Sequence, residues 1–274
     1  MSTHSKEYIM GRTSEEYQRL RLQAKVWETA TQRVLQQAGL GEGMQCLDIG
    51  CGPGEVMRLM GDSVGPKGHV TGIDVDGKLG NEALGVLQAT TENQFAFIET
   101  DVEATDDIPG APFDLTFARF TLIHLKDQIA ALRKMLHWTK PGGVVVIQEY
   151  ESRTWDVYPA HAAFAELQQI FCTVMEKAGR DLYLGTKLQT RFVEAGLGRP
   201  DGTDVVGALV GFDVGAGMGQ DAYNSVFPVA QKMGLTDESK RQTIFATIDE
   251  TIQAGTHTIL SPLLISAWKR KPLR

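Results

Sequence analysis

Residues 46–55 read Cys46-Leu47-Asp48-Ile49-Gly50-Cys51-Gly52-Pro53-Gly54-Glu55, an apolar run that passes into three glycines alternating with other residues. An apolar run that ends in such a turn is typical of a buried strand followed by a helix. Glycine allows the backbone to approach a ligand closely, and the first amides of a helix present a partial positive charge. The segment therefore predicts a strand, a glycine-rich loop and a helix that together face a ligand.

An acidic residue, Asp74, ends the next apolar run, twenty residues after Gly54. A carboxylate at this place can accept both hydroxyls of a ribose in nucleotide-binding doubly wound folds. Glu55 stands where the dinucleotide-binding pattern G-x-G-x-x-G/A needs a third small residue. With Asp48 two residues before the first glycine, the pattern D-x-G-x-G-x-G favours a mononucleoside with a charged amino-acid tail over a pyrophosphate.

Short apolar runs alternate with helical patterns through the region that surrounds this motif. The runs interpreted as strands cover residues 45–49, 69–73, 95–99, 114–118 and 144–150. Continuous apolar strands separated by helices indicate βαβ crossovers and a parallel sheet that is covered on both faces. We therefore predict an α/β fold, a doubly wound, Rossmann-like and mostly parallel sheet of seven strands.

The predicted organisation has four parts. Residues 1–42 form an N-terminal helical lid, and residues 43–214 form the Rossmann-like ligand-binding domain. Residues 215–255 start with a glycine-rich stretch and do not fit a βαβ unit, so we expect a helical cap inserted between the last two strands. Residues 256–274 supply the last strand of the sheet domain.

The composition is that of an ordinary folded chain, with 274 residues, 42% hydrophobic residues and a formal net charge of −7. An acidic chain matches a nucleic-acid backbone poorly, so we expect no nucleic-acid partner. No run approaches the roughly 18 apolar residues of a membrane span, and the first residues lack the order of a secretory signal. Three cysteines cannot build a disulfide framework, and six scattered histidines show no zinc spacing. We expect a cytoplasmic protein without a membrane or metal partner.

As a set, these motifs resemble those of the class I S-adenosylmethionine-dependent methyltransferases. The likeness is to the small-molecule branch that includes quinone-biosynthesis and natural-product enzymes, and it runs from about residue 44 to residue 150. The stretches that carry it are Leu47–Gly54, Asp74–Val75, Thr100–Val102, Phe113–Arg119 and Lys140–Gly143. The resemblance implies S-adenosyl-L-methionine as cofactor and S-adenosyl-L-homocysteine as product. The cofactor-binding residues that it implies are Asp48, Gly50, Cys51, Gly52, Asp74, Val75, Asp101, Val102 and Arg119.

Structural interpretations of three of these residues stay open. Asp48 can instead cap the following helix, and Asp101 can be an ordinary loop acid before a turn. Cys51 fits a small apolar filler better than a nucleophile, because no base is visible near it.

His124, just past the fourth strand, is the candidate catalytic base. Methyl transfer is an in-line displacement in which the cofactor supplies the difficult chemistry, and a base is needed only if the nucleophile must lose a proton. The alternative is that His124 merely lines the cofactor pocket. Glu149 and Glu151, at the end of the fifth strand, are further candidates that could instead anchor a cationic substrate.

Two groups outside the motif region are candidates for contacts with ligands. Tyr8 and Gln23 could close over the methionine end of the cofactor, although an arm that simply packs on the domain explains them equally well. The aromatic residues of the later helices suit either a wall for a flat acceptor or an ordinary core: Trp155, Tyr158, Phe164, Tyr223 and Phe227.

The predicted function is methyl transfer to a small organic acceptor such as a secondary metabolite or a quinone-like compound. Three alternatives remain at this point: a nucleotide-dependent oxidoreductase, an RNA or protein methyltransferase, and a non-catalytic relative that binds the nucleoside. The atom methylated and the choice between a monomer and a homodimer are also open.

Overall fold

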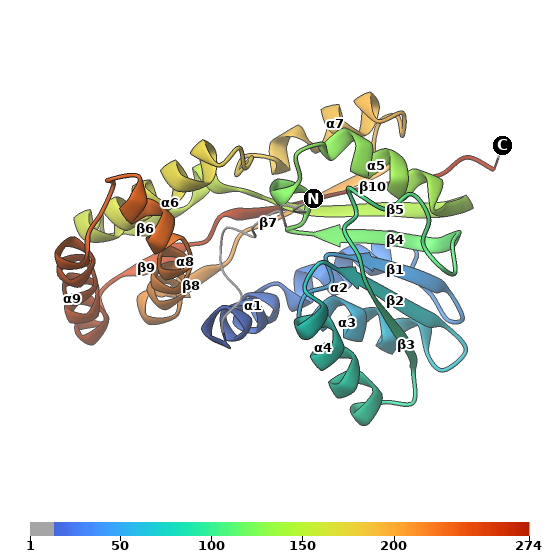
Figure 1. Cartoon of the computed structure of the whole chain (residues 1–274), viewed down its shortest axis with the longest axis horizontal. Helices are drawn as coiled ribbons and strands as arrows, with labels where there is room; N and C mark the ends of the chain where they lie inside the picture. The colour runs from blue at the N-terminus through green and yellow to red at the C-terminus, as the bar shows by residue number, and fades with distance from the viewer. Residues whose placement is uncertain (1–13, 274) are drawn as a thin grey trace, which may run out of the picture. The chain divides into compact units, whose positions relative to one another are not determined.

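A seven-stranded sheet organises the larger part of the computed structural model, which describes residues 14–273 (Figure 1). Its strands lie in the order β3-β2-β1-β4-β5-β10-β7. In chain order they are β1 (Gln45–Ile49), β2 (His69–Asp74), β3 (Gln94–Glu99), β4 (Phe113–Arg119), β5 (Thr139–Glu151), β7 (Gly202–Val206) and β10 (Leu263–Arg270). The pairings from β3 to β5 are parallel, and β10 runs antiparallel to both of its neighbours. The predicted doubly wound, mostly parallel sheet is confirmed.

The strand order reverses between β1 and β4. These two strands pair in parallel, with Ile49 opposite Ala118 near their carboxyl ends. In an open α/β sheet a crevice forms outside the carboxyl ends at such a point, because the connections that follow the two strands leave on opposite faces. The glycine loop after β1 and the turn after β4 therefore meet at the expected ligand position.

Two layers of helices cover the sheet (Figure 1). The helices on one face are α2 (Glu28–Gln37), α3 (Glu55–Val64) and α4 (Gly77–Thr90), and those on the other are α5 (Gln128–His137) and α7 (Leu188–Glu194). Because side chains alternate along a strand, Cys46 packs in the core against α2 and α3, whereas Leu47 packs in the opposite core with α5 and α7. Both side chains are fully buried.

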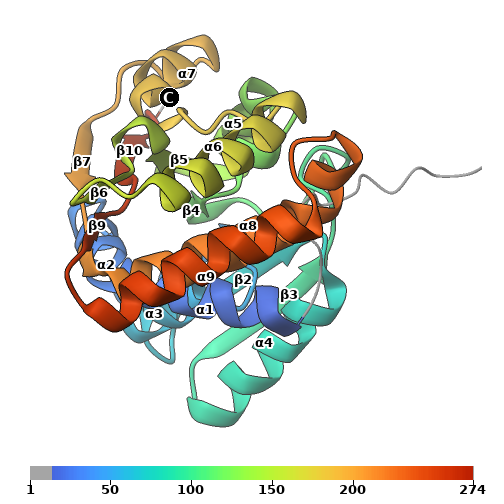
Figure 2. The same ribbon diagram turned by 90° about the vertical axis from the view of Figure 1, so that its left-hand side faces the viewer.

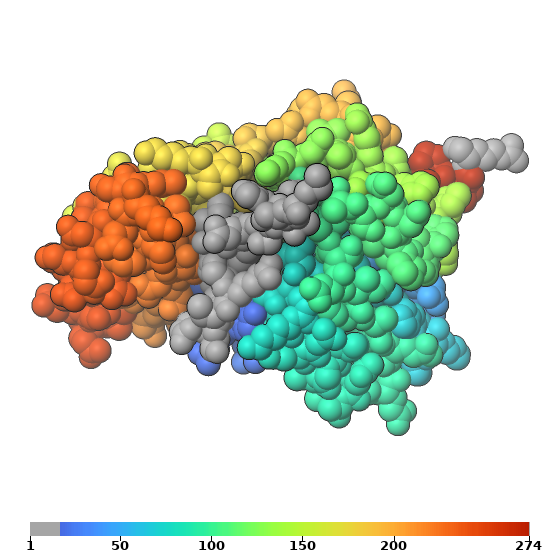
Figure 3. All heavy atoms as spheres, in the orientation of Figure 1, coloured from blue at the N-terminus to red at the C-terminus, as the bar shows by residue number. Residues whose placement is uncertain are grey.

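The chain crosses from β3 to β4 through residues 100–112 as a loop rather than a helix. The loop lies in front of the sheet in Figure 1, and its atoms form part of the surface in Figure 3. Nζ of Lys134 in α5 donates to the carbonyl oxygens of Val102, Glu103 and Thr105, at 3.2, 3.0 and 2.7 Å. One side chain thus fixes the start of the loop beside the carboxyl end of β3.

A second compact unit comprises residues 14–23, 153–182 and 207–262 (Figure 2). Its elements include the helices α6 (Ala162–Lys177), α8 (Phe212–Lys232) and α9 (Glu238–Ala254). A small antiparallel sheet, in the order β6-β9-β8, joins β6 (Asp156–Tyr158), β9 (Thr258–Leu260) and β8 (Leu209–Gly211). Helix α1 (Ser14–Val26) begins in this unit. The segment expected to form a cap, residues 215–255, corresponds to most of α8 and all of α9, and α6 packs against both.

Short 3₁₀ turns complete the described elements: η1 (Leu122–His124), η2 (Ser152–Thr154) and η3 (Gly185–Lys187). Within residues 14–273, no helix combines the length and the apolar character needed to cross a membrane.

Candidate functional site

The glycine loop is pinned at both ends and open in the middle. Gly50, Gly52 and Gly54 all have positive φ, at 69, 48 and 78°, a region that side chains other than glycine rarely adopt. A Cβ on Gly50 would collide with Thr121, and one on Gly54 would lie 3.0 Å from Ala83. A Cβ on Gly52 would meet no atom of the described residues within 4 Å beyond its chain neighbours. The middle of the loop therefore borders space in which a ligand can approach the backbone.

Asp74, at the carboxyl end of β2, is bonded to this loop. Its Oδ2 accepts from the amide of Gly52 at 2.9 Å, and its Oδ1 accepts from the amide of Asp76 at 2.9 Å. Asp76 in turn caps α4 by accepting from the amide of Leu79 at 3.1 Å. These backbone bonds orient the Asp74 carboxylate beside the glycine loop, and a carboxylate is the kind of acceptor that a ribose hydroxyl requires.

Asp48, two residues before Gly50, is 2% exposed, and its Oδ2 has no hydrogen-bond partner among the described residues. Burial raises the pKa of Asp48 to about 7, the guanidinium of Arg119 acts against this rise, and Asp74 adds to it. The alternative that Asp48 caps the helix is wrong, because α3 begins after Gly54 and no side chain bonds to its first amides. A buried carboxylate oxygen of this kind suits a cationic group such as an ammonium.

Arg119 ends β4 and starts a chain of buried polar contacts. Its Nη1 donates to Oγ1 of Thr31 at 2.8 Å, and that hydroxyl donates to Oε1 of Gln148 at 2.8 Å. Nε2 of Gln148 then donates to Oγ of Ser266 at 2.9 Å. Thr31, Gln148 and Ser266 are at most 1% exposed. This relay holds the guanidinium in place, and sequence reasoning missed it. The available signal was a glutamine directly after the apolar run Val144–Ile147 of β5.

The residues expected to read the adenine lie beside the carboxyl ends of β2 and β3. Val75 is 43% exposed directly after Asp74, whereas Val102 is buried. Oδ1 of Asp101 accepts from the amide of Glu103 at 2.8 Å, so this acid shapes the turn in which it lies. Both of its expected roles are compatible with this geometry, and its contact with adenine stays a prediction.

His124 lies in η1, half-buried, in the turn that follows β4. The turn begins at Phe120, whose φ of 54° is the one positive value at a non-glycine residue in the part of the chain that the structure describes. Oε1 of Glu149 accepts from the amides of Thr121 and Leu122, at 3.0 and 2.7 Å. The carboxylate considered as an alternative base is therefore bound to the backbone that carries His124.

Glu151, the other acid near the end of β5, is 3% exposed, and its Oε2 accepts from Oγ1 of Thr186 at 2.7 Å. Between the two acids, the ring of Tyr150 stacks on Phe120 with centroids 4.0 Å apart. Its hydroxyl accepts from Nε1 of Trp27 at 2.7 Å. Sequence reasoning missed this aromatic cluster, because Trp27 and Tyr150 are 123 residues apart in the chain.

Most of the aromatic residues expected to form a substrate wall are packed within the second unit. Phe164 and Tyr223 are completely buried, and the ring of Trp155 meets Phe164 edge to face at 5.5 Å. The core interpretation therefore holds for Phe164 and Tyr223, whereas Tyr158 is 78% exposed. Gln23 lies half-buried in α1, in the same unit, and Tyr8 lies outside the described residues. The contacts of these two residues with the cofactor stay predictions.

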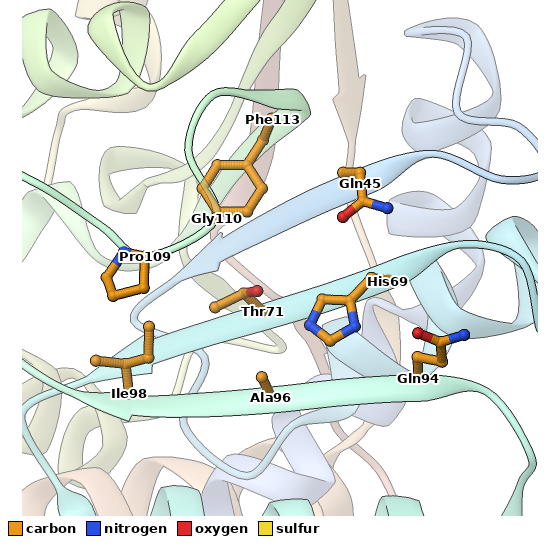
Figure 4. A pocket seen from close by; sticks show the side chains of 9 residues that line it. All are labelled: Gln45, His69, Thr71, Gln94, Ala96, Ile98, Pro109, Gly110 and Phe113. Atoms are coloured by element: carbon orange, nitrogen blue, oxygen red, sulfur yellow. The ribbon is translucent and has the colours of Figure 1, made fainter.

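A separate concavity of about 460 Å³ lies on the face of β1, β2 and β3 beneath the 100–112 loop (Figure 4). Gln45, His69 and Gln94 line one end of it, at the amino ends of these strands, and the remaining lining residues are Thr71, Ala96, Ile98, Pro109, Gly110 and Phe113. Most of its lining residues therefore lie in the amino halves of the strands or in the 100–112 loop, and none belongs to the glycine loop. Within the described residues, no group of three or more histidine, cysteine, aspartate or glutamate side chains could hold a metal ion.

An open glycine loop, an oriented acid after β2 and a buried acid before the loop meet at the point where the strand order reverses. This fold and site define a Rossmann-like domain for a nucleoside with a charged tail. The model of a methyltransferase domain family matches residues 17–198, and the chain belongs to that family. The predicted resemblance to class I S-adenosylmethionine-dependent methyltransferases is confirmed.

Individual relatives agree with this assignment. A demethylmenaquinone methyltransferase from Staphylococcus aureus is 31% identical over 139 residues, which cover 50% of this chain and 54% of the relative. The chain therefore matches about half the length of such curated relatives.

Solved structures share the fold. A candidate methyltransferase from Bacillus halodurans has a TM-score of 0.60 at 15% identity and covers 89% of this chain and 99% of its own. A SAM-dependent methyltransferase from Aquifex aeolicus has a TM-score of 0.53 at 21% identity and covers 73% and 93%.

Proposed function

We propose that this protein transfers a methyl group from S-adenosyl-L-methionine to a small organic acceptor. The observation that carries the proposal is the open middle of the glycine loop at Gly52, which the Asp74 carboxylate contacts from the end of β2. The residues of the site fit the cofactor as a set. A ribose needs the paired acceptors of Asp74, and an ammonium needs an anionic partner such as the buried Oδ2 of Asp48.

Each part of the site has a role under this proposal. Gly50, Cys51 and Gly52 face the amino-acid part of the cofactor through their backbone, and Asp48 and Arg119 supply charges there. Val75 packs on the adenine, while Asp101 and Val102 read its edge. When bound, the cofactor supplies a methyl group on a sulfonium, an electrophile that needs no metal.

The chain's own contribution to catalysis is orientation and proton removal. The protein must hold the acceptor in line with the methyl group and exclude water from it. His124 accepts the proton of an acceptor hydroxyl or amine as the acceptor's lone pair bonds to the methyl carbon and the carbon–sulfur electron pair returns to sulfur. For an acceptor that needs no deprotonation, His124 instead contributes packing and hydrogen bonding.

A flat, partly aromatic acceptor, quinone-like or a secondary metabolite, is the class we favour. Two observations support it: the S. aureus relative is named for a quinone substrate, and Phe120 and Tyr150 form a half-buried aromatic stack next to the turn of His124. The net charge of −7 also disfavours a nucleic acid. A cytoplasmic location belongs to the same proposal, and the choice between a monomer and a homodimer is open to direct measurement.

Calorimetric titration with S-adenosylhomocysteine and, separately, with NAD⁺ tests the cofactor. We expect binding of the first and none of the second, and the reverse result would favour an oxidoreductase. Transfer from cofactor labelled in its methyl group, offered quinols, phenols and amines together with RNA and protein controls, tests the acceptor. Label found only in RNA or protein would overturn the small-molecule proposal. Tight cofactor binding with no label in any acceptor would favour the non-catalytic alternative.

A further inference from the structure

We propose that Glu149 is a positioning residue, which fixes His124 through the backbone of the turn between them and does not itself take a proton. This inference rests on the proposed role of His124 as the group that meets the acceptor. The sequence pattern predicts two candidate roles for Glu149, a base or an anchor for a cation. The hydrogen bonds of Glu149 to the turn support a positioning role instead.

Glu149 is hydrogen-bonded to the turn that follows β4 and carries His124. One carboxylate oxygen, Oε1, receives the consecutive amides of Thr121 and Leu122, at 3.0 and 2.7 Å. Glu149 is completely buried in β5, a strand paired on both sides. An oxygen that accepts two backbone amides is held in place by both bonds, and a buried group on a central strand has little freedom to move. The carboxylate is therefore a rigid anchor for the turn.

The turn that carries His124 has a backbone conformation that must be held by its surroundings. Phe120 holds a left-handed backbone conformation that is unfavourable for a residue with a side chain. Its amide donates to the carbonyl of Gln148 at 3.0 Å, so β5 holds the turn through residue 148 as well as Glu149. A strained conformation persists only where the surroundings enforce it. Without Glu149, the part-buried amide of Thr121 and the buried amide of Leu122 would lose this acceptor and the turn would relax.

The backbone of Thr121 connects the turn to His124. The amide of His124 donates to the carbonyl of Thr121 at 3.0 Å, which closes η1. Oγ1 of Thr121 lies 3.0 Å from the carbonyl oxygen of Ile49, the residue that precedes the glycine loop. Thr121 thus links Glu149, the start of the glycine loop and His124. A change at Glu149 reaches His124 through one shared residue.

Two variants of Glu149 separate positioning from proton transfer. Glu149→Gln keeps an oxygen that can accept both amides, whereas Glu149→Ala removes it. A positioning role predicts that Gln retains methyl transfer within about 10-fold of wild type, while Ala loses about 10²-fold in kcat, because a misplacement of the order of 1 Å can cost that much. A proton-transfer role predicts that Gln and Ala are equally inactive, since neither can take a proton.

A double-mutant cycle tests whether Glu149 acts through His124. In a His124→Ala background, Glu149→Ala should add less than about 2-fold to the loss in kcat, because residues that act as a unit are not additive. Independent, additive losses would contradict the proposal. Asp201→Asn is the matched control, because Asp201 also accepts a backbone amide, that of Arg270 at 2.8 Å, at the opposite end of the same sheet. We expect it to leave kcat unchanged.

A measurement that does not depend on catalytic turnover tests this inference separately from the proposed function. NMR of the six histidine rings, with His124 assigned by the signal lost in His124→Ala, reports directly on its surroundings. The His124 signal should shift or broaden in Glu149→Ala and stay near wild type in Glu149→Gln and Asp201→Asn. An unmoved signal in a folded Glu149→Ala would overturn the proposal. A moved signal in a protein that transfers no methyl group would retain it and reject only the proposed function.

If Glu149→Ala fails to fold, Glu149→Asp replaces it. Aspartate keeps the charge but withdraws the oxygens by one methylene, so it should displace the His124 signal and lower kcat as Ala does. Wild-type activity and an unmoved signal in Glu149→Asp would contradict positioning.

Discussion

Oδ2 of Asp74 and the backbone amide of Gly52 form a hydrogen bond of 2.9 Å, which joins the end of the second strand to the open middle of the glycine loop. The end of β2 and the glycine loop, both of which a bound nucleoside is expected to contact, are therefore joined by this bond. The same carboxylate orients the loop and is expected to receive the ribose, so its removal should affect the ligand more than the fold.

Asp74→Ala should weaken binding of S-adenosylhomocysteine. Loss of a charged acceptor of two hydrogen bonds costs about 2–4 kcal/mol, which corresponds to roughly 30-fold to 10³-fold in the dissociation constant. Calorimetric titration measures this effect. Asp62→Ala, on the surface of α3 and paired there with Arg58, is the control and should bind normally. An unchanged dissociation constant in a folded Asp74→Ala would remove Asp74 from the site.

Gly52→Ala should also lose cofactor affinity, because its Cβ would occupy the open side of the loop and its φ of 48° disfavours any side chain. We expect a stability cost of about 1–2 kcal/mol from the backbone alone. Gly85→Ala is the matched control, since Gly85 lies exposed in α4 with nothing within 4 Å of its Cβ position. It should leave binding unchanged and raise stability by about 0.5–1 kcal/mol. Thermal unfolding and calorimetry of both variants provide the comparison.

His124→Ala should lower kcat by ~10²-fold or more while the dissociation constant of S-adenosylhomocysteine stays near normal. The physical reason is that a base acts in the transition state and contributes little to binding of the product cofactor. Steady-state kinetics with the acceptor found by labelling measure the first quantity, and calorimetry measures the second. Retained turnover would leave His124 as a lining residue and point to an acceptor that reacts without losing a proton.

Asp48 should make both stability and binding depend on pH. Its pKa is raised in the folded protein from 3.8 to about 7, so the folded state binds this proton more tightly than the unfolded state. Stability contributed by this group is therefore lost as the pH rises from about 4 through about 7. A cationic ligand stabilises the carboxylate, so S-adenosylhomocysteine should bind more tightly as the pH rises to about 7 and should release a proton on binding.

Asp48→Asn tests this dependence, because its carboxamide does not titrate. Stability curves at pH 5 and pH 8 should lie closer together in this variant than in wild type, and calorimetry in buffers of different ionisation enthalpy should show no proton release from this group. Asp62→Asn should behave as wild type. An equal proton release in wild type and in Asp48→Asn would show that another group titrates.

Thr31→Val should show how much the buried hydrogen-bond chain from Arg119 to Ser266 contributes to the free energy of unfolding. Valine has nearly the same shape as threonine but leaves Nη1 of Arg119 and Oε1 of Gln148 without the hydroxyl that joins them. Each unsatisfied buried group costs about 1–3 kcal/mol, so denaturant unfolding should show a loss of about 2–6 kcal/mol for the two groups together. Cofactor binding should weaken as well if Arg119 moves. Thr31→Ser keeps the hydroxyl and should recover most of the stability. Equal losses in both variants would assign the effect to packing instead.

Local sequence was sufficient to predict the glycine loop, the acid after the second strand and the alternation of strands and helices. Each depends on neighbours within a few residues: the conformational freedom of Gly50 and Gly52, the continuous apolar run of β1, and the position of Asp74 at the end of an apolar run. Parallel strands with crossover helices leave few arrangements, so a doubly wound, mostly parallel sheet followed from the same pattern. The strand order itself was given only by the structure.

The partners of the polar side chains were decided only by the tertiary structure. Thr31 and Gln148 are 117 residues apart, and Trp27 and Tyr150 are 123 residues apart, yet both pairs are hydrogen-bonded. Glu149 was recognisable as an acid at the end of a strand, but its contact with the turn of His124 depends on the register of β4 against β5. Sequence periodicity specifies which face a side chain occupies, whereas a hydrogen bond requires two atoms within about 3 Å. That proximity is set by how strands and helices distant in the chain pack together.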